Sequence, residues 1–191
     1  GRNDLRPIVG GRSRINFARR IDTLLADPLA NLPPGSIGGP EPVARRRNLA
    51  YRNLTRARML NLATGQQMLA LMRARGVAVT ALTPAKIRDG RDGATLASLD
   101  TSQRAALLKD TPLWFYALRE AEFNGGRLAG VGGRMVAETF HRAIEGSQIW
   151  IMADPTWRPT LGPGPDTFRM VDLLLFAFEG KEALLNPLGD G

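Results

Sequence analysis

The chain is 191 residues long, with 43% hydrophobic and 23% charged residues, values typical of a folded globular domain rather than a disordered or fibrous protein. It contains no cysteine and a single histidine, His141, which excludes disulfides, thiolate metal sites, a cysteine nucleophile and any mechanism that takes two histidines from this chain. Uninterrupted apolar runs such as Leu173 to Phe178 are far shorter than the roughly 20 residues of a membrane-spanning helix, so no membrane span is expected.

The net charge of +8 is concentrated in one segment of the chain. Between Pro42 and Arg88 there is no Asp or Glu, whereas ten Lys and Arg residues fall there, so the remainder is slightly acidic. This local surplus predicts contact with an anionic group, such as nucleic acid, a membrane surface, an acidic partner or a carboxylate-bearing cofactor. A solvated helix surface explains the same surplus without any partner.

The amino-terminal part of the chain is predicted to contain two helices. The first has an apolar residue at every third or fourth position from Arg14 to Ala26, and a longer one runs from about Val43 to Leu60. Loops rich in Pro and Gly are expected near residues 28–42 and, much later in the chain, near 153–167.

The next helix is predicted from its capping residues. Thr64 and Gln67 fit the Thr-x-x-Gln capping box, in which each side chain satisfies a free backbone amide of the first turn, and a left-handed Gly76 is expected to end the helix. Further helices are predicted to begin at Thr83-Pro84, at Thr101 or Ser102, at Thr111-Pro112 and after Asp166-Thr167, and to span Gly130 to Glu145. Short strands fit only Val77 to Leu82 and Ile149 to Met152. The predicted fold class is therefore all-α.

Asn53 lies in the centre of the apolar stripe of the second predicted helix. At about 100° per residue, Leu49, Ala57 and Leu60 fall within about 40° of Asn53 around the helix axis. Because burying an unpaired amide costs roughly 1–3 kcal/mol, Asn53 is expected to have a fixed hydrogen-bond partner. Arg56, one turn on, is placed to neutralise a carboxylate or phosphate. A core Asn that caps a neighbouring loop, with Arg56 reaching into solvent, explains the same pattern.

The other polar residues do not indicate acid–base chemistry. His141 is expected on the solvated face of its helix rather than as a metal ligand or general base. Glu120 and Glu122 are two positions apart on a helix, so their side chains diverge. The glycines of Gly130 to Gly133 follow no strand and match no phosphate-binding pattern. No catalytic residue and no metal ligand is therefore predicted within this chain.

Four segments of the chain, taken together in their order and spacing, indicate a resemblance to a known protein family. They are Arg52-Asn53-Leu54-Thr55-Arg56-Ala57-Arg58 with Leu62-Ala63-Thr64-Gly65-Gln66, then Thr111 to Glu122, Gly126 to Phe140, and Phe168 to Leu174. The first resembles the Asn-x-x-Arg-Gly-Arg … Leu-Pro-Ser-Gly-Gln element of the peroxidase–cyclooxygenase superfamily, with Ala57 in place of the glycine and Ala63 in place of the proline. The others are similar to the bacterial branch of these animal-type haem peroxidases. The resemblance as a whole covers roughly Arg14 to Phe178.

The resemblance implies that residues 1–191 form a single carboxy-terminal fragment of a haem peroxidase domain, with an animal haem peroxidase-like fold that is incomplete on its own. In that family the helix with Asn-x-x-Arg lies on the proximal side of the haem. Its Asn accepts a hydrogen bond from the proximal histidine and its Arg pairs with a haem propionate; by position these are Asn53 and Arg56. The proximal and distal histidines and a calcium-binding loop belong upstream. The haem iron ligand is therefore expected on an upstream segment or on an amino-terminal peroxidase chain that acts as a partner.

The implied function is oxidation of a small-molecule or protein substrate by hydrogen peroxide, with this chain supplying the proximal support helix and inactive alone. Nucleic acid is not favoured as a partner by this resemblance. The alternative is a non-catalytic helical module that binds an acidic partner or nucleic acid through the basic 42–88 segment. A degenerate peroxidase-like domain kept as a scaffold is a third interpretation. The absence of cysteine fits cytosolic and exported bacterial proteins alike.

Overall fold

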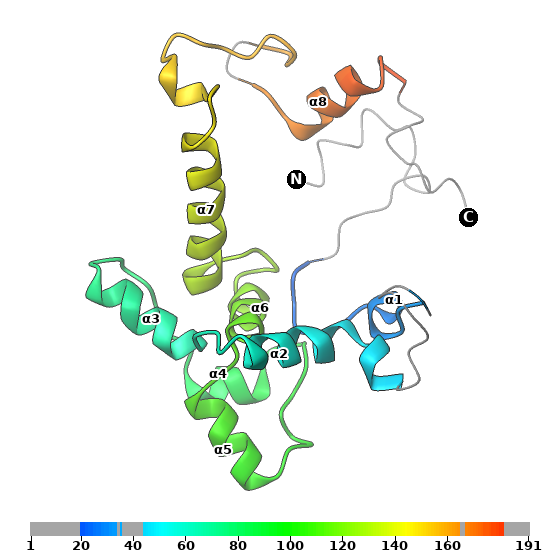
Figure 1. The fold of residues 1–191 in the computed structure, drawn as a ribbon, viewed down its shortest axis with the longest axis vertical. Coiled ribbons are helices and arrows are strands. Elements are labelled where there is room, and N and C mark those ends of the chain that lie inside the picture. Colours follow the sequence, from blue (N-terminus) through cyan, green and yellow to red (C-terminus); the bar gives the residue numbers. More distant parts are fainter. Residues whose placement is uncertain (1–19, 34, 36–43, 165–166, 182–191) are drawn as a thin grey trace. The chain divides into compact units, whose positions relative to one another are not determined.

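The structure, a computed structural model, describes residues 20–33, 35, 44–164 and 167–181 (Figure 1). The secondary structure of these described residues is helical, without a β-strand, so the predicted all-α class is confirmed for them. They divide into two compact units, one from Arg20 to Arg142 and one that takes the described residues from Ala143 onward.

Most of the helices belong to the Arg20–Arg142 unit. In chain order it contains α1 (Asp27–Ala30), the 3-10 helix η2 (Ala44–Arg47), α2 (Leu49–Met59), α3 (Gly65–Ala74), α4 (Pro84–Asp89), α5 (Thr101–Lys109), α6 (Leu113–Phe123) and most of α7 (Gly130–Glu145). The described residues of the second unit contain the 3-10 helix η3 (Ile151–Ala153) and α8 (Met170–Ala177).

The helix predicted from Arg14 to Ala26 is wrong over its described part, because residues 20–26 are not helical. Residues 14–19 lie outside the described residues. Groups that a helix would pair locally are bonded elsewhere: Ile21 N–H donates to the Gly126 carbonyl at 3.0 Å, and the Asp22 carboxylate accepts the Leu24 N–H at 2.8 Å. Tertiary contacts with distant segments outweigh the helical periodicity here.

The helix predicted from Val43 to Leu60 is interrupted at Asn48 in its described part. The Asn48 side chain accepts the Tyr51 N–H at 3.0 Å and caps α2, while η2 precedes it as a separate turn. The strand suggested for Val77 to Leu82 is absent as well. Its backbone bonds to side chains instead, since the Tyr116 hydroxyl accepts the Leu82 N–H at 3.0 Å.

Several helix ends match the sequence expectations. Thr64 accepts the Gln67 N–H at 3.2 Å and Gln67 accepts the Thr64 N–H at 2.9 Å, which confirms the capping box of α3. Gly76 has a φ of +75°, as expected of a glycine that ends a helix. Helix α4 begins at Pro84, α5 begins at Thr101 with Asp100 as its cap, and α7 has the predicted bounds.

The hydrophobic core of the Arg20–Arg142 unit is built around α6. Its buried residues are Leu69, Ile87, Leu96, Tyr116 and Val131, contributed by α3, α4, α6, α7 and the loop before α5. A Cβ on Gly65 would overlap the Tyr116 ring, so glycine at the start of α3 permits the close approach of α3 and α6. Helix α2, by contrast, has no buried residue and packs against η2 and α1.

Candidate functional site

The two residues predicted to face a cofactor lie on α2, one turn apart. Asn53 is half-buried and Arg56 is exposed. The fixed hydrogen-bond partner expected for Asn53 is not found among the described residues, where its side-chain amide makes no hydrogen bond. The alternative in which Asn53 caps a neighbouring loop therefore has no support within the described part of the chain.

Arg56 borders an open pocket of about 410 Å³ along α2. The pocket is lined by Arg46, Tyr51, Arg52, Thr55, Arg56 and Met59. Arg52 donates to the Arg46 carbonyl at 3.4 Å, which leaves further guanidinium N–H groups of Arg52 for an external acceptor. Because no acidic side chain lines this pocket, its electrostatics suit an anionic group such as a carboxylate.

The residues of this chain fit the edge of a haem but not the axial ligation of its iron. The guanidiniums of Arg52 and Arg56 match the charge of propionates. His141, the single histidine of the sequence, lies on α7 with its side chain exposed, as predicted. Across residues 20–33, 35, 44–164 and 167–181 there is no group of three or more His, Asp or Glu side chains that would hold a metal ion.

The basic residues between 42 and 88 are distributed over η2, α2, α3 and α4, and several are bonded within the chain. Arg47 donates to the Leu32 carbonyl at 2.7 Å, and Arg73 to the Val79 carbonyl at 3.0 Å. Arg88 forms an ion pair with Asp89 at 2.7 Å. Arg56 and Arg58 of α2 make no such bond within the described part of the chain, so α2 retains positive charge for an external anion.

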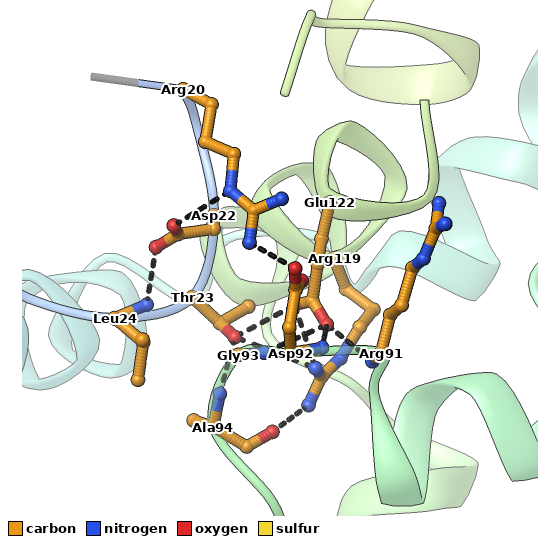
Figure 2. A network of polar contacts seen from close by, with 10 residues as sticks. All are labelled: Arg20, Asp22, Thr23, Leu24, Arg91, Asp92, Gly93, Ala94, Arg119 and Glu122. Carbon is orange, nitrogen blue, oxygen red and sulfur yellow. Dashed lines mark hydrogen bonds and ion pairs between the residues drawn. The ribbon is translucent and has the colours of Figure 1, made fainter. Parts of the chain in front are cut away.

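A second polar cluster, which was not predicted from the sequence, is buried on α6 (Figure 2). Glu122 is 2% exposed and forms an ion pair with Arg119, which is fully buried, at 2.8 Å. One Glu122 oxygen accepts the backbone N–H groups of Arg91, Asp92 and Gly93, the last at 3.1 Å, and the other accepts the Thr23 hydroxyl at 2.9 Å. Burial acts to raise the pKa of Glu122, but the Arg91 amide, the Thr23 hydroxyl and the Arg119 charge together hold this pKa below its usual value.

The loop that meets this cluster depends on two glycines. Gly90 has a φ of +68°, and a Cβ there would overlap the Arg119 guanidinium. A Cβ on Gly93 would overlap the Glu122 carboxylate. Arg119 also donates to the Ala94 carbonyl, so α6 both donates hydrogen bonds to the loop and accepts them from its backbone amides.

Glu120 points away from Glu122 and caps α7. Its two carboxylate oxygens accept the N–H groups of Val131 and Gly132, each at 2.9 Å, at the positive end of the helix dipole. Burial raises the pKa of Glu120, and the two amides act in the opposite direction without cancelling that effect. The predicted divergence of Glu120 and Glu122 is confirmed.

The burial of these charged residues was missed, although a signal existed. Around α6, Arg119 and Glu120 lie within about 60° of Tyr116, the residue at the centre of the core face. Charged residues on the core face of an apolar helix indicate buried groups with internal partners, although Arg119 Nε has no hydrogen-bond partner among the described residues.

Within the described residues, none of the helices combines the length and the apolar character needed to cross a bilayer. No protein-family model, no curated protein and no solved structure matches this chain.

Proposed function

We propose that this chain is the carboxy-terminal helical part of an animal-type haem peroxidase, which uses hydrogen peroxide to oxidise a substrate, and that α2 supports the proximal side of the haem. One observation carries the proposal: Asn53 and Arg56 stand one turn apart on a helix without buried residues, and the Asn53 amide has no partner among the described residues. The order of the four sequence segments supports the same assignment.

Asn53 is a positioning residue in this proposal. Its side-chain oxygen accepts a hydrogen bond from the imidazole N–H of a histidine that an upstream segment or a partner chain supplies. This bond fixes the tautomer and the orientation of the imidazole and increases its basicity toward a metal. When bound, the haem supplies the peroxide chemistry.

Arg56 binds a haem propionate, with Arg52 beside it in the same pocket. A guanidinium presents paired N–H donors that match the two oxygens of a carboxylate, which suits this role better than an ammonium group. The pocket wall contains apolar side chains as well as cations, in keeping with a ligand that is apolar with two charged arms.

The exposed apolar residues around α2 support a covering segment. Among large apolar side chains, Leu54 is 37% exposed, Leu60 63% and Met59 80%. Leu54 and Met59 lie about 140° apart around α2, so a covering segment would contact more than one side of the helix. The segment that carries the histidines is the proposed occupant of this surface.

The test is the variant Asn53→Ala in the complex of this chain with the histidine-bearing polypeptide. Loss of the bond to the imidazole is expected to lower turnover with hydrogen peroxide by about 10- to 100-fold and to shift the Soret band. Asn53→Asp keeps an acceptor and should retain more activity. Arg58→Ala, about 140° away around α2, is the matched control and should behave as wild type.

An unchanged spectrum and turnover in Asn53→Ala contradicts the assigned role. Binding of nucleic acid by the wild-type chain, falling steeply as salt is raised and without any haem, would instead favour the basic module that binds through residues 42–88.

A further inference from the structure

Thr23 joins three segments that are far apart in the sequence (Figure 2). Its hydroxyl donates to Glu122 of α6 at 2.9 Å, and it accepts the Ala94 N–H at 2.8 Å and a weaker bond from Arg119 at 3.4 Å. The hydroxyl thus uses its donor and its acceptor sites at once. Its partners Glu122 and Arg119 are buried, so neither can exchange this bond for one to bulk water without exposing a charge.

The rest of the segment is fixed around the same point. Ile21 N–H donates to the Gly126 carbonyl at 3.0 Å, and Arg20 pairs with Asp92 in the loop that Glu122 binds. Residues 20–26 form no helix of their own, so these contacts with the core determine where the segment lies.

The segment fixed by Thr23 is linked to the start of α2 through α1 and through two hydrogen bonds between Leu32 and Arg47. Helix α1 follows at Asp27 and packs against α2. Leu32 N–H donates to the Arg47 carbonyl at 3.0 Å, and the Arg47 side chain returns a bond to the Leu32 carbonyl at 2.7 Å. Arg47 is the last residue of η2 and precedes Asn48, the residue that caps α2.

The start of α3, which follows α2 after a short loop, is held by separate bonds. Gly65 N–H donates to the Thr111 carbonyl at 2.9 Å, and the Gln66 side chain donates to the Leu108 carbonyl at 2.9 Å. Between these ends α2 has no buried residue. The position of its central residues therefore depends on the contacts of α2 with α1 and η2 and on the start of α3, and not on deeply buried side chains of α2 itself.

We propose that Thr23 is a positioning residue, which fixes the segment carrying α1 and η2 and thereby sets the face of α2 that presents Asn53 and Arg56. The ordering of α2 by Thr23 follows from the contacts of this chain alone. Its consequence for a haem pocket rests on the proposed function. Thr23 touches neither Asn53 nor Arg56, so any effect on them is transmitted through α1 and η2.

The test compares Thr23→Val with Thr23→Ser in the full chain, by hydrogen exchange resolved to peptides. Valine keeps the shape of threonine but leaves the Ala94 N–H and one Glu122 oxygen with one bond fewer. Exchange in residues 20–32 and in η2 and α2 is expected to accelerate about tenfold, the scale of one lost hydrogen bond to a charged group. Helices α3 and α6 should remain protected. Thr23→Ser keeps the hydroxyl and should restore the wild-type pattern, and Thr80→Val, at an exposed threonine, is the matched control.

Two results overturn the proposal: faster exchange confined to residues 20–26, or a uniform loss of protection that includes α3 and α6. The positioning role of Thr23 and the proposed peroxidase function can be tested independently of each other. If Thr23→Val loosens α2 but no haem complex forms with the histidine-bearing polypeptide, the positioning role stands without the peroxidase. If Asn53→Ala lowers turnover while Thr23→Val leaves α2 unchanged, the peroxidase stands and the positioning role does not.

Discussion

Two carboxylates on α6 show how the environment of a residue sets its titration. Glu120 and Glu122 are both buried on the same helix, two positions apart. Burial dominates at Glu120, which has two amide donors but no cation, so its pKa is raised. Glu122 is bonded to the Arg119 guanidinium, to the Thr23 hydroxyl and to backbone amides, and these partners lower its pKa. The two residues are therefore expected to affect stability in opposite directions as the pH changes.

Substituting each carboxylate separately should reveal these opposite contributions. Because its folded-state pKa is lowered, Glu122 stabilises the fold above its ordinary pKa, and this contribution disappears as the pH falls through the lowered value. Because its folded-state pKa is raised, Glu120 stabilises the fold below its ordinary pKa, and this contribution is lost as the pH rises through the raised value. The free energy of unfolding of Glu122→Gln should therefore fall below that of the wild type by an amount, its deficit, that grows from acid to neutral pH. At neutral pH this deficit should reach about 3–5 kcal/mol, as expected for a broken buried pair.

The deficit of Glu120→Gln should shrink over the same range. Urea unfolding followed by circular dichroism at a series of pH values measures both deficits. Deficits that change in the same direction for the two variants would contradict the different environments assigned to these residues.

At the scale of elements, helix starts were the features that the sequence predicted best. The capping box of α3 uses side-chain and backbone groups of residues 64–67 alone. Such a signal is local, so distant segments do not alter it. The predicted helix over Arg14 to Ala26 rested on periodicity, which describes a face but not the contacts that compete for its backbone. Ile21 and Gly126 lie far apart in sequence, and the hydrogen bond between them was not visible from periodicity.

The cap of α3 provides a quantitative check. Thr64→Ala removes the acceptor for the Gln67 N–H and should lower the free energy of unfolding by about 1 kcal/mol. Thr80→Ala, at an exposed threonine outside any helix, should change it by less than about 0.5 kcal/mol. Chemical denaturation of the two variants and the wild type gives the comparison. Equal effects would mean that the cap of α3 adds nothing beyond the general cost of losing a threonine side chain.

At the scale of the whole molecule, the proposed haem site requires a ligand from outside residues 1–191. His141 lies exposed on α7, so His141→Ala should leave the Soret band and the turnover of the complex unchanged. The chain without the histidine-bearing polypeptide should show no Soret band of histidine-ligated haem. Absorption spectra of the wild type and the variant, alone and in the complex, test both expectations. Loss of the band in His141→Ala would make His141 the axial ligand and remove the need for an external histidine.

The sequence by itself determined the helical class, most helix boundaries and the place of Asn53 and Arg56 on one helix. These features depend on capping residues, proline and glycine positions and the 3.6-residue period, all of which act over a few neighbours. Only the tertiary structure decided that residues 20–26 leave the helical conformation, that α2 buries none of its residues, and that Arg119 and Glu122 form a buried cluster with Thr23. The physical reason is the sequence separation of the groups involved, because these outcomes depend on hydrogen bonds between residues about 70 to 100 positions apart. Whether such bonds form is determined by the packing of the whole unit and not by neighbouring residues.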